Sequence, residues 1–423
     1  MRFMKTVLAS AMLAALAVGG AAQAATNVVW WDFLSGGDGV RMKAMIDAFN
    51  ASHPDIQIQA TTLEWGVPFY TKVQTSAAVG QGPDVMTYHL SRLPLGVQSG
   101  VLRPFEDADL AMAGTTPDQY NPANWNAAHV DGKLYAIPLD THSIILYYNK
   151  DLLKKAGLLG DDGLPKGLDG LDNFNAALKK LTTGDQVGLS LPDDGASAWR
   201  IFYTLLNQQD GVFLKDGKVL DGDNLDKAVK AIQAVAGWTS GGYTPKMTEY
   251  PASIALFTSG KAAMHINGVW EVPTMVDLAK QGKLFDWGAI QIPTLFDHPA
   301  TWADSHSFAI PNNAGNPITP EKLKAVMTVI GWMNQNSLMW AGGGHIPAYL
   351  PVTQSADYKA LQPQGTYASL AATEVLEPIS TITGVASPTY DAAGNYLVPG
   401  EQGDMDPSDA ASQLQSDLQA AVQ

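Results

Sequence analysis

The sequence contains no cysteine among its 423 residues. Small exported proteins usually stabilise themselves with disulfides, so an exported chain without them needs hydrophobic cores that are large enough alone. The same absence excludes a thiol nucleophile, a cysteine-ligated metal site and the usual lipid-attachment site at a bacterial signal cleavage point. The length of the chain favours two domains, because one core rarely serves so many residues.

Basic residues are also scarce. Lys and Arg number 26 against 41 Asp and Glu, which gives a formal net charge of −15 at pH 7. No Lys/Arg cluster interrupts this acidic surplus. The charge balance therefore argues against nucleic acid and against an anionic membrane surface as partners.

Long hydrophobic runs are missing, and the longest apolar stretch belongs to an N-terminal signal. Arg2 and Lys5 form a positive start, residues 7–18 are apolar, and Ala22-Gln23-Ala24 is a small-x-small cleavage site. A membrane span needs about 20 apolar residues, and no segment reaches that length. We expect residues 1–24 to be a signal peptide and the mature protein to be periplasmic in a two-membrane bacterium, without direct membrane insertion.

Enzyme and metal motifs with a recognisable mechanism are absent. The sequence has no G-x-S-x-G, P-loop or H-E-x-x-H, and the glycine-rich "GGGHIP" (342–347) lacks the context of a dinucleotide site. The eight histidines are scattered, with no i, i+4 pair on a predicted helix. We therefore expect no cofactor and no metal. A periplasmic glycan-active lyase or hydrolase stays open, because two carboxylates can meet in space without a sequence signature.

What the chain does contain is an alternation of strand and helix patterns. "NVVWWDF" (27–33) is rich in β-branched and aromatic residues, and "IQIQAT" (56–61) alternates as a strand does. Between them, "VRMKAMIDAFN" (40–50) is apolar on one helical face. Two strands joined by a helix predict a parallel sheet with helices on its faces.

Tryptophan is frequent, with 11 residues, and several stand beside carboxylates at predicted strand ends or in loops. A pyranose has apolar C–H faces and a polar rim of hydroxyls, so an aromatic ring covers the face while Asp, Glu, Asn and His bind the rim. Trp270, beside Glu271, and Trp302, near Asp304, are the best stacking candidates. Other indoles are expected to fill the core: Trp238, Trp287 and Trp332.

Independent polar clusters are expected at one rim of the predicted sheets. In open parallel sheets, ligands bind beyond the carboxyl ends of the strands. Residues 32–35, Tyr88-His89 and residues 140–142 follow or interrupt predicted strands in this way. We expect a ligand cleft there, with Asp140 as the best acceptor for a hydroxyl.

Three stretches carry a resemblance to a known family. They are "LYYNKDLLKKAGL" (146–158), "FTSGKAAMHINGVWEV" (257–272) and "WADSHSFAIPNNAGNP" (302–317). In order and spacing, and together with the opening "WWDFLSGGDGVRMKAMIDAFN", they resemble the extracellular sugar-binding proteins of bacterial ABC importers, the group that includes maltodextrin-binding protein. The segment after residue 383 departs from the pattern, so no site residue is taken from it.

The resemblance implies an α/β protein with the two-lobed periplasmic-binding-protein fold. Each lobe would be a mainly parallel sheet flanked by helices, and the chain would cross between the lobes three times. We expect the crossings near 138–142, 264–268 and 309–312. The N-terminal lobe would comprise 25–139 plus 267–310, and the C-terminal lobe 140–266 plus 311–423.

The resemblance also implies a function. Such a receptor captures a mono- to oligosaccharide, glycoside or polyol by lobe closure and delivers it to the permease subunits of an ABC importer. It is not an enzyme, and we expect a monomer. A metal or anion receptor on the same fold is the further alternative; a charged ligand would need a cation in the cleft, for which Arg41, Arg92 and Arg200 are candidates.

Candidate ligand contacts stand where the family places its own. These positions are Asp32, Ser35, Gly36, Trp65, His89, Asp140, Thr141, His142, Trp199, Asn267, Gly268, Trp270, Trp302, Asp304, His306, Gly343 and His345.

Overall fold

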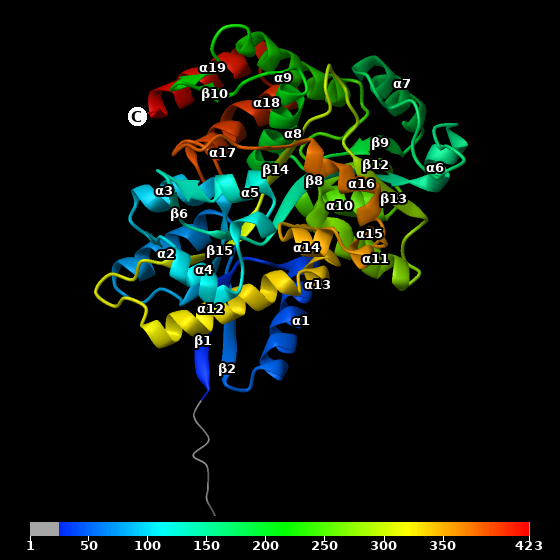
Figure 1. The fold of residues 1–423 in the computed structure, drawn as a ribbon. Helices are drawn as coiled ribbons and strands as arrows, with labels where there is room; N and C mark the ends of the chain where they lie inside the picture. Colours follow the sequence, from blue (N-terminus) through cyan, green and yellow to red (C-terminus); the bar gives the residue numbers. More distant parts are fainter. Residues whose placement is uncertain (1–24, 423) are drawn as a thin grey trace, which may run out of the picture.

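The computed structural model describes residues 25–422 (Figure 1). The expected signal peptide lies outside the described residues. Two large sheets form two lobes, one below the other in Figure 1. Within the described part of the chain, no helix combines the length and the apolar character needed to cross a membrane.

The first sheet has the strand order β2-β1-β3-β15-β4, with β7 also paired to β15. β1 runs parallel to β2 and β3, and β15 runs antiparallel to β3. The strands are β1 (Thr26–Asp32), β2 (Ile56–Thr62), β3 (Val85–His89), β4 (Leu102–Arg103), β7 (Ile137–Pro138) and β15 (His306–Pro311). The helices around it are α1 (Gly36–Ser52), α2 (Val67–Ala78), α3 (Leu93–Gln98), α4 (Asp107–Ala113), α5 (Pro122–Ala127) and α12 (Pro320–Gln335), with the 3-10 turn η1 (Leu90–Arg92).

The predicted strand–helix–strand unit is confirmed as β1-α1-β2. The predicted apolar face of α1 is buried, and Met45 and Phe49 have no exposed surface. The Asp131-Gly132 pair joins the short hairpin strands β5 (His129–Val130) and β6 (Lys133–Leu134). Both of its residues have positive φ, as a tight hairpin turn requires.

The second sheet is built around β8 (Asp140–Asn149), whose ten residues are all buried. Its order is β17-β14-β8-β12-β9, and β13 and β16 also pair with β8. Parallel pairs are present, while β8 runs antiparallel to each of its own partners. The other strands are β9 (Val187–Ser190), β12 (Ala262–Gly268), β13 (Trp287–Gln291), β14 (Thr301–Asp304), β16 (Ile346–Pro347) and β17 (Glu374–Leu376).

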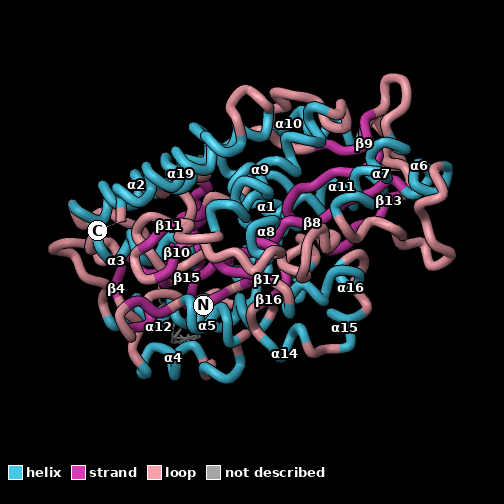
Figure 2. Tube along the Cα trace, turned by 90° about the horizontal axis from the view of Figure 1, so that it is seen from above, coloured by secondary structure: helices cyan, strands magenta, loops and turns pink. Residues whose placement is uncertain are grey.

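Helices cover both faces of this second sheet, and a small hairpin of β10 (Leu214–Lys215) and β11 (Lys218–Val219) lies outside it. Figure 2 shows α9 and α19 side by side. The helices are α6 (Lys150–Lys155), α7 (Leu171–Leu181), α8 (Gly195–Asn207), α9 (Asn224–Ser240), α10 (Tyr250–Thr258), α11 (Val272–Lys280), α14 (Leu350–Thr353), α15 (Ala356–Lys359), α16 (Gln364–Tyr367), α17 (Pro388–Ala392), α18 (Val398–Gln402) and α19 (Pro407–Ala421). The short helix α13 (Leu338–Ala341) contacts α1 of the first lobe as well as β16 and α15. The 3-10 turn η3 (Val269–Glu271) joins β12 to α11.

Within residues 25–422 the chain passes between the sheets at three places, and two of them differ from our expectation. The first, from β7 to β8, is where we placed it. A crossing at 264–268 is wrong, because Met264–Gly268 pairs with β8 residue by residue within the second sheet. A crossing at 309–312 is wrong too, because Ala309 pairs with Met86 in the first sheet. The chain instead crosses between β14 and β15, and again between α13 and β16.

The expected lobe boundaries change accordingly. β13 and β14 belong to the second sheet, although we placed 267–310 in the N-terminal lobe. α12 packs on α4 and β1, although we placed 311–423 in the C-terminal lobe. We propose 25–139 plus 305–341 for the N-terminal lobe and 140–304 plus 346–422 for the C-terminal lobe.

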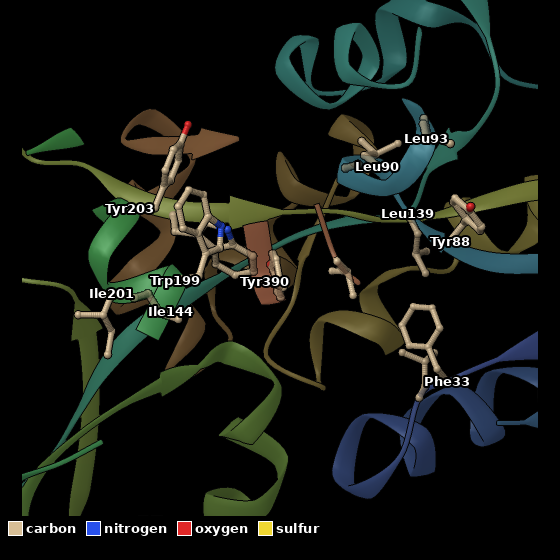
Figure 3. Packing of buried hydrophobic residues seen from close by; sticks show 14 of the residues in the cluster. Phe33, Tyr88, Leu90, Leu93, Leu139, Ile144, Trp199, Ile201, Tyr203 and Tyr390 are labelled. Atoms are coloured by element: carbon tan, nitrogen blue, oxygen red, sulfur yellow. The ribbon is translucent and has the colours of Figure 1, made fainter. Parts of the chain in front are cut away.

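The C-terminal segment, which departs from the family pattern, completes the core of the second lobe. Figure 3 shows Tyr390 of α17 near Trp199 of α8, with Phe33, Tyr88 and Leu139 in the neighbouring part of the buried cluster. All five belong to one continuous hydrophobic cluster. The segment after residue 383 therefore fixes α8, and α8 in turn reaches the cleft.

Candidate functional site

A cavity of about 660 Å³ is lined by residues of both lobes. Its size falls within the range of small-molecule sites, about 300–1,000 Å³. The loop after β1 and the carboxyl end of β3 contribute from the first lobe, and β8, α8, α10 and η3 from the second. The full lining is Phe33, Leu34, Ser35, Gly36, Gly37, Asp38, Trp65, His89, His142, Asp194, Ala196, Ser197, Arg200, Tyr250, Pro251, Ile254, Trp270, Glu271, Thr274 and His306.

Seven of the seventeen candidate residues line this cavity: Ser35, Gly36, Trp65, His89, His142, Trp270 and His306. The others are absent from its lining: Asp32, Asp140, Thr141, Trp199, Asn267, Gly268, Trp302, Asp304, Gly343 and His345. Most of this second group are buried behind the cavity wall, where their polar atoms bind other protein groups.

Trp199 and Trp302 are part of the core. Neither side chain is exposed. Both indole N–H groups donate to the same carboxylate oxygen, Oε1 of Glu377, at 2.9 and 2.8 Å. The structure thus gives Trp302 no cavity surface on which a ligand ring can stack.

Asp140, the expected hydroxyl acceptor, is saturated by protein donors. Its carboxylate receives the backbone N–H of His306 at 2.9 Å and the indole N–H of Trp340 at 2.6 Å. It also bonds Nδ1 of His142 at 3.1 Å and Nδ1 of His306 at 2.9 Å. Asp140 therefore orients two imidazoles whose Nε2 atoms remain available to a ligand.

The charges of this cluster follow from burial and proximity. Burial alone would raise the pKa of Asp140, but the neighbouring His306 and His345 hold it well below its usual value. Burial opposes the charged form of His306, yet Asp140 raises the pKa of this imidazole. Burial, together with the charge of His306, lowers the pKa of His142 to about 3. His142 is thus neutral at pH 7.

The other candidates outside the lining have structural partners. Asp304 accepts hydrogen bonds from Ser91 of the opposite lobe, and Asp32 accepts from the N–H of Leu34. Thr141 donates to Asn124 at 2.9 Å, and Asn267 accepts from the N–H of Gly268 at 2.7 Å. His345 bonds the carbonyl of Gly343 at 3.1 Å.

Gly268 lets the indole of Trp270 lie against its backbone. A Cβ at position 268 would stand 2.2 Å from the ring of Trp270. The indole N–H donates to the hydroxyl of Tyr250 at 2.7 Å, and that hydroxyl donates to Glu271 at 2.8 Å. Trp270 is therefore held in one orientation at the cavity wall.

Acidic and phenolic residues that the sequence did not identify as ligand contacts also line the cavity. Tyr250 begins α10, and nothing in the surrounding sequence distinguishes it. Burial raises the pKa of Glu271 and raises that of Asp38 to about 7. Asp38 is buried in the first turn of α1, and Ser35 occupies the cap position.

Of the three candidate arginines, Arg200 of α8 lines the cavity. Arg41 forms an ion pair with Asp277 of α11 at 2.9 Å, which joins the two lobes. Arg92 donates to the backbone carbonyl of Ala386 at 2.6 Å.

The model of the bacterial extracellular solute-binding protein family matches residues 44–364. The chain belongs to this family. Among curated relatives, the sn-glycerol-3-phosphate-binding periplasmic protein UgpB of Escherichia coli is 26% identical over 386 residues, covering 85% of this chain and 81% of that protein. The galactooligosaccharide-binding protein of Bacillus subtilis is 25% identical over 283 residues, 64% of this chain and 60% of that protein. This chain thus aligns with less than two thirds of the latter's length.

Solved structures show the same fold. The GacH receptor of Streptomyces glaucescens, studied unliganded and with acarbose, has a TM-score of 0.77 at 18% identity and covers 94% of this chain and 98% of its own. UgpB of Mycobacterium tuberculosis, in complex with glycerophosphocholine, has a TM-score of 0.78 at 16% identity, with coverages of 94% and 98%. Family membership and these neighbours confirm the predicted two-lobed fold.

Proposed function

We propose that this family member is the periplasmic receptor of an ABC importer and captures a sugar, glycoside or polyol between its lobes. The observation that carries the proposal is the cavity of about 660 Å³ with aromatic and polar lining from both lobes. The functions named for the relatives, galactooligosaccharide binding and sn-glycerol-3-phosphate binding among them, support a polyhydroxylated ligand. We propose a monomer that delivers this ligand to permease subunits.

Closure of the lobes is the proposed mechanism of capture. A ligand that touches both lobes binds the closed form better and shifts the open–closed equilibrium toward it. Reversing a 1:99 population takes about 5.5 kcal/mol of differential binding. Several hydrogen bonds of about 1 kcal/mol each, with charged partners contributing more, supply this amount together with aromatic contact.

The proposed ligand contacts are the seven lining candidates together with Arg200 and Tyr250. The neutral imidazole of His142 offers a ring nitrogen to hydroxyl groups, as does His89, whose Nδ1 is already bonded to Tyr70 at 2.6 Å. Trp65, with 39% of its surface exposed, presents an indole face from the first lobe.

The arrangement of carboxylates favours binding without bond cleavage. The candidate acid pairs for a glycan-active enzyme are Asp304 with Asp140 and Asp304 with Glu271. Glu271 lines the cavity, but Asp304 and Asp140 do not, so neither pair has both carboxylates at the cavity. A metal receptor is disfavoured because the one carboxylate of the candidate ligand cluster is already occupied by protein donors. Asp140, His142, His306 and His345 lie close enough to share an ion, but the Asp140 oxygens are already engaged by four protein donors.

A ligand screen tests the proposal. The mature protein is screened by thermal shift against a panel of mono- to oligosaccharides, glycosides and polyols, and hits are measured by calorimetry. We expect at least one hit to raise the melting temperature by mass action and to be recovered chemically unchanged. Conversion of the hit into products would support the glycan-active enzyme instead, and a panel without hits would refute sugar capture.

A further inference from the structure

Arg200 is a cation that the protein itself does not neutralise. Only 7% of the residue is exposed, and it lies on the cavity wall. Its Nε has no hydrogen-bond partner, and among residues 25–422 no carboxylate oxygen lies within 4.0 Å of its guanidinium nitrogens. Burying an uncompensated charge is costly, and ligand capture removes the remaining water around it.

Three indoles fix the guanidinium in place. Its carbon lies 4.6 Å from the ring centre of Trp302, 4.8 Å from that of Trp270 and 5.7 Å from that of Trp65. Trp65 comes from the opposite lobe, so the contact spans the cleft. Cation–π contacts attract the guanidinium without consuming its N–H donors, which stay free for a ligand.

The other ionisable side chains of the cavity lining already have hydrogen-bond partners within the protein. Asp194 caps α8 and accepts both from the N–H and from the hydroxyl of Ser197, and Glu271 accepts from Tyr250. Asp38 accepts from the N–H of Gly39. His306 is matched by Asp140 at 2.9 Å. Arg200 is thus the cation of the described lining that lacks a carboxylate partner.

We propose that the captured sugar or polyol carries an acidic group, and that its anionic oxygens bind the guanidinium of Arg200. A planar guanidinium forms two parallel hydrogen bonds with a carboxylate or a phosphate, and the anion also neutralises its charge. Neutral hydroxyl groups can accept hydrogen bonds from the guanidinium, but they leave its charge uncompensated. This inference rests on the proposed function and names the substrate class within it. A uronate carboxylate and a phosphate ester share the required chemistry.

The test compares matched neutral and acidic probes by titration calorimetry on the mature protein. The pairs are glucose with glucuronate, galactose with galacturonate, and glycerol with sn-glycerol 3-phosphate. We expect the acidic member of at least one pair to bind about 30-fold more tightly, corresponding to about 2 kcal/mol. A preference for glucuronate or galacturonate would identify the acidic group as a carboxylate, and a preference for sn-glycerol 3-phosphate would identify it as a phosphate.

Variants of Arg200 assign the preference to its charge. In Arg200→Met the acidic preference should fall below about threefold, while Arg200→Lys, which keeps the charge without the planar fork, should retain part of it. Arg103→Met is the matched control, because Arg103 pairs with Asp109 at 2.7 Å and is absent from the cavity lining. This control should keep the full preference, and circular dichroism melting confirms that each variant is folded.

The possible failures are distinguishable. Tight binding of neutral probes or of neutral panel sugars, without an acidic preference, overturns the acidic-ligand inference and leaves sugar capture standing. An acidic preference that survives Arg200→Met in a folded protein also overturns it. Absence of binding to every probe and to the whole panel contradicts both the inference and the proposed function.

Discussion

Replacing Trp270 with alanine should weaken ligand binding about 30-fold. The indole lies on the backbone of Gly268, contacts the guanidinium of Arg200 at 4.8 Å and donates to Tyr250 at 2.7 Å. These contacts hold the indole face toward the ligand, so the alanine variant loses aromatic contact with the ligand, about 0.5–1.5 kcal/mol, and the burial of roughly 40 Å² of apolar surface, about 1 kcal/mol. The sum is about 2 kcal/mol, which corresponds to about 30-fold in Kd.

Titration calorimetry with the best ligand of the panel measures this effect. Trp270→Phe keeps an aromatic face and loses the N–H donor to Tyr250, so it separates the face from the hydrogen bond that orients it. Trp332→Ala is the matched control: this indole packs edge-on against Phe49, with ring centres 5.5 Å apart, and does not line the cavity. A change of less than about threefold in folded Trp270→Ala would refute the role given to this indole.

Three further predictions concern stability and closure. Trp302→Ala should lower the free energy of unfolding by about 3–5 kcal/mol, because the indole of Trp302 is buried and also binds Glu377. Urea unfolding measures this loss, and a loss below about 1 kcal/mol would contradict the prediction. Arg41→Ala should weaken ligand binding by about two- to fivefold, because the ion pair of Arg41 with Asp277 joins the two lobes and contributes about 1 kcal/mol at most. An unchanged affinity in calorimetry would show that this ion pair does not favour closure. Burial raises the pKa of Asp304 from 3.8 to about 7. Between these two values the folded protein holds a proton that the unfolded chain has released, so stability should rise as the pH falls from about 7 to about 4. Asp304→Asn should therefore reduce the stability difference between pH 5 and pH 8 by about 2–3 kcal/mol in urea unfolding, and an unaltered difference would mean that Asp304 is ionised throughout.

The elements that could be predicted from the sequence are those set by local periodicity. The β1-α1-β2 unit follows from residues that are neighbours in the chain, and so does the Asp131-Gly132 turn. The first crossing was also placed correctly, at the polar residues that open β8. The other two crossings were misplaced because a strand's pattern does not show which sheet it joins. β12 and β15 are both fully buried and differ only in their partners.

The sequence also does not show which side chains of the candidate site reach the cavity. Trp270 and Trp302 each stand near a carboxylate, yet one lines the cavity and the other is covered. The difference depends on Glu377, which binds the indole of Trp302 from 75 residues away. Arg200 lies on a helix that is buried nearly all round, and the indoles around it come from distant parts of the chain. Such long-range contacts leave no local signature.

Closure of the two lobes around a ligand is directly measurable because the chain contains no cysteine. Val67, at the start of α2, and Glu249, before α10, are exposed and flank cavity residues of opposite lobes. Val67→Cys and Glu249→Cys together carry two spin labels at defined positions, because the chain has no other thiol. Double electron–electron resonance should show a distance distribution that becomes shorter and narrower at saturating ligand. An unchanged distribution with a ligand that calorimetry shows to be bound would contradict capture by lobe closure.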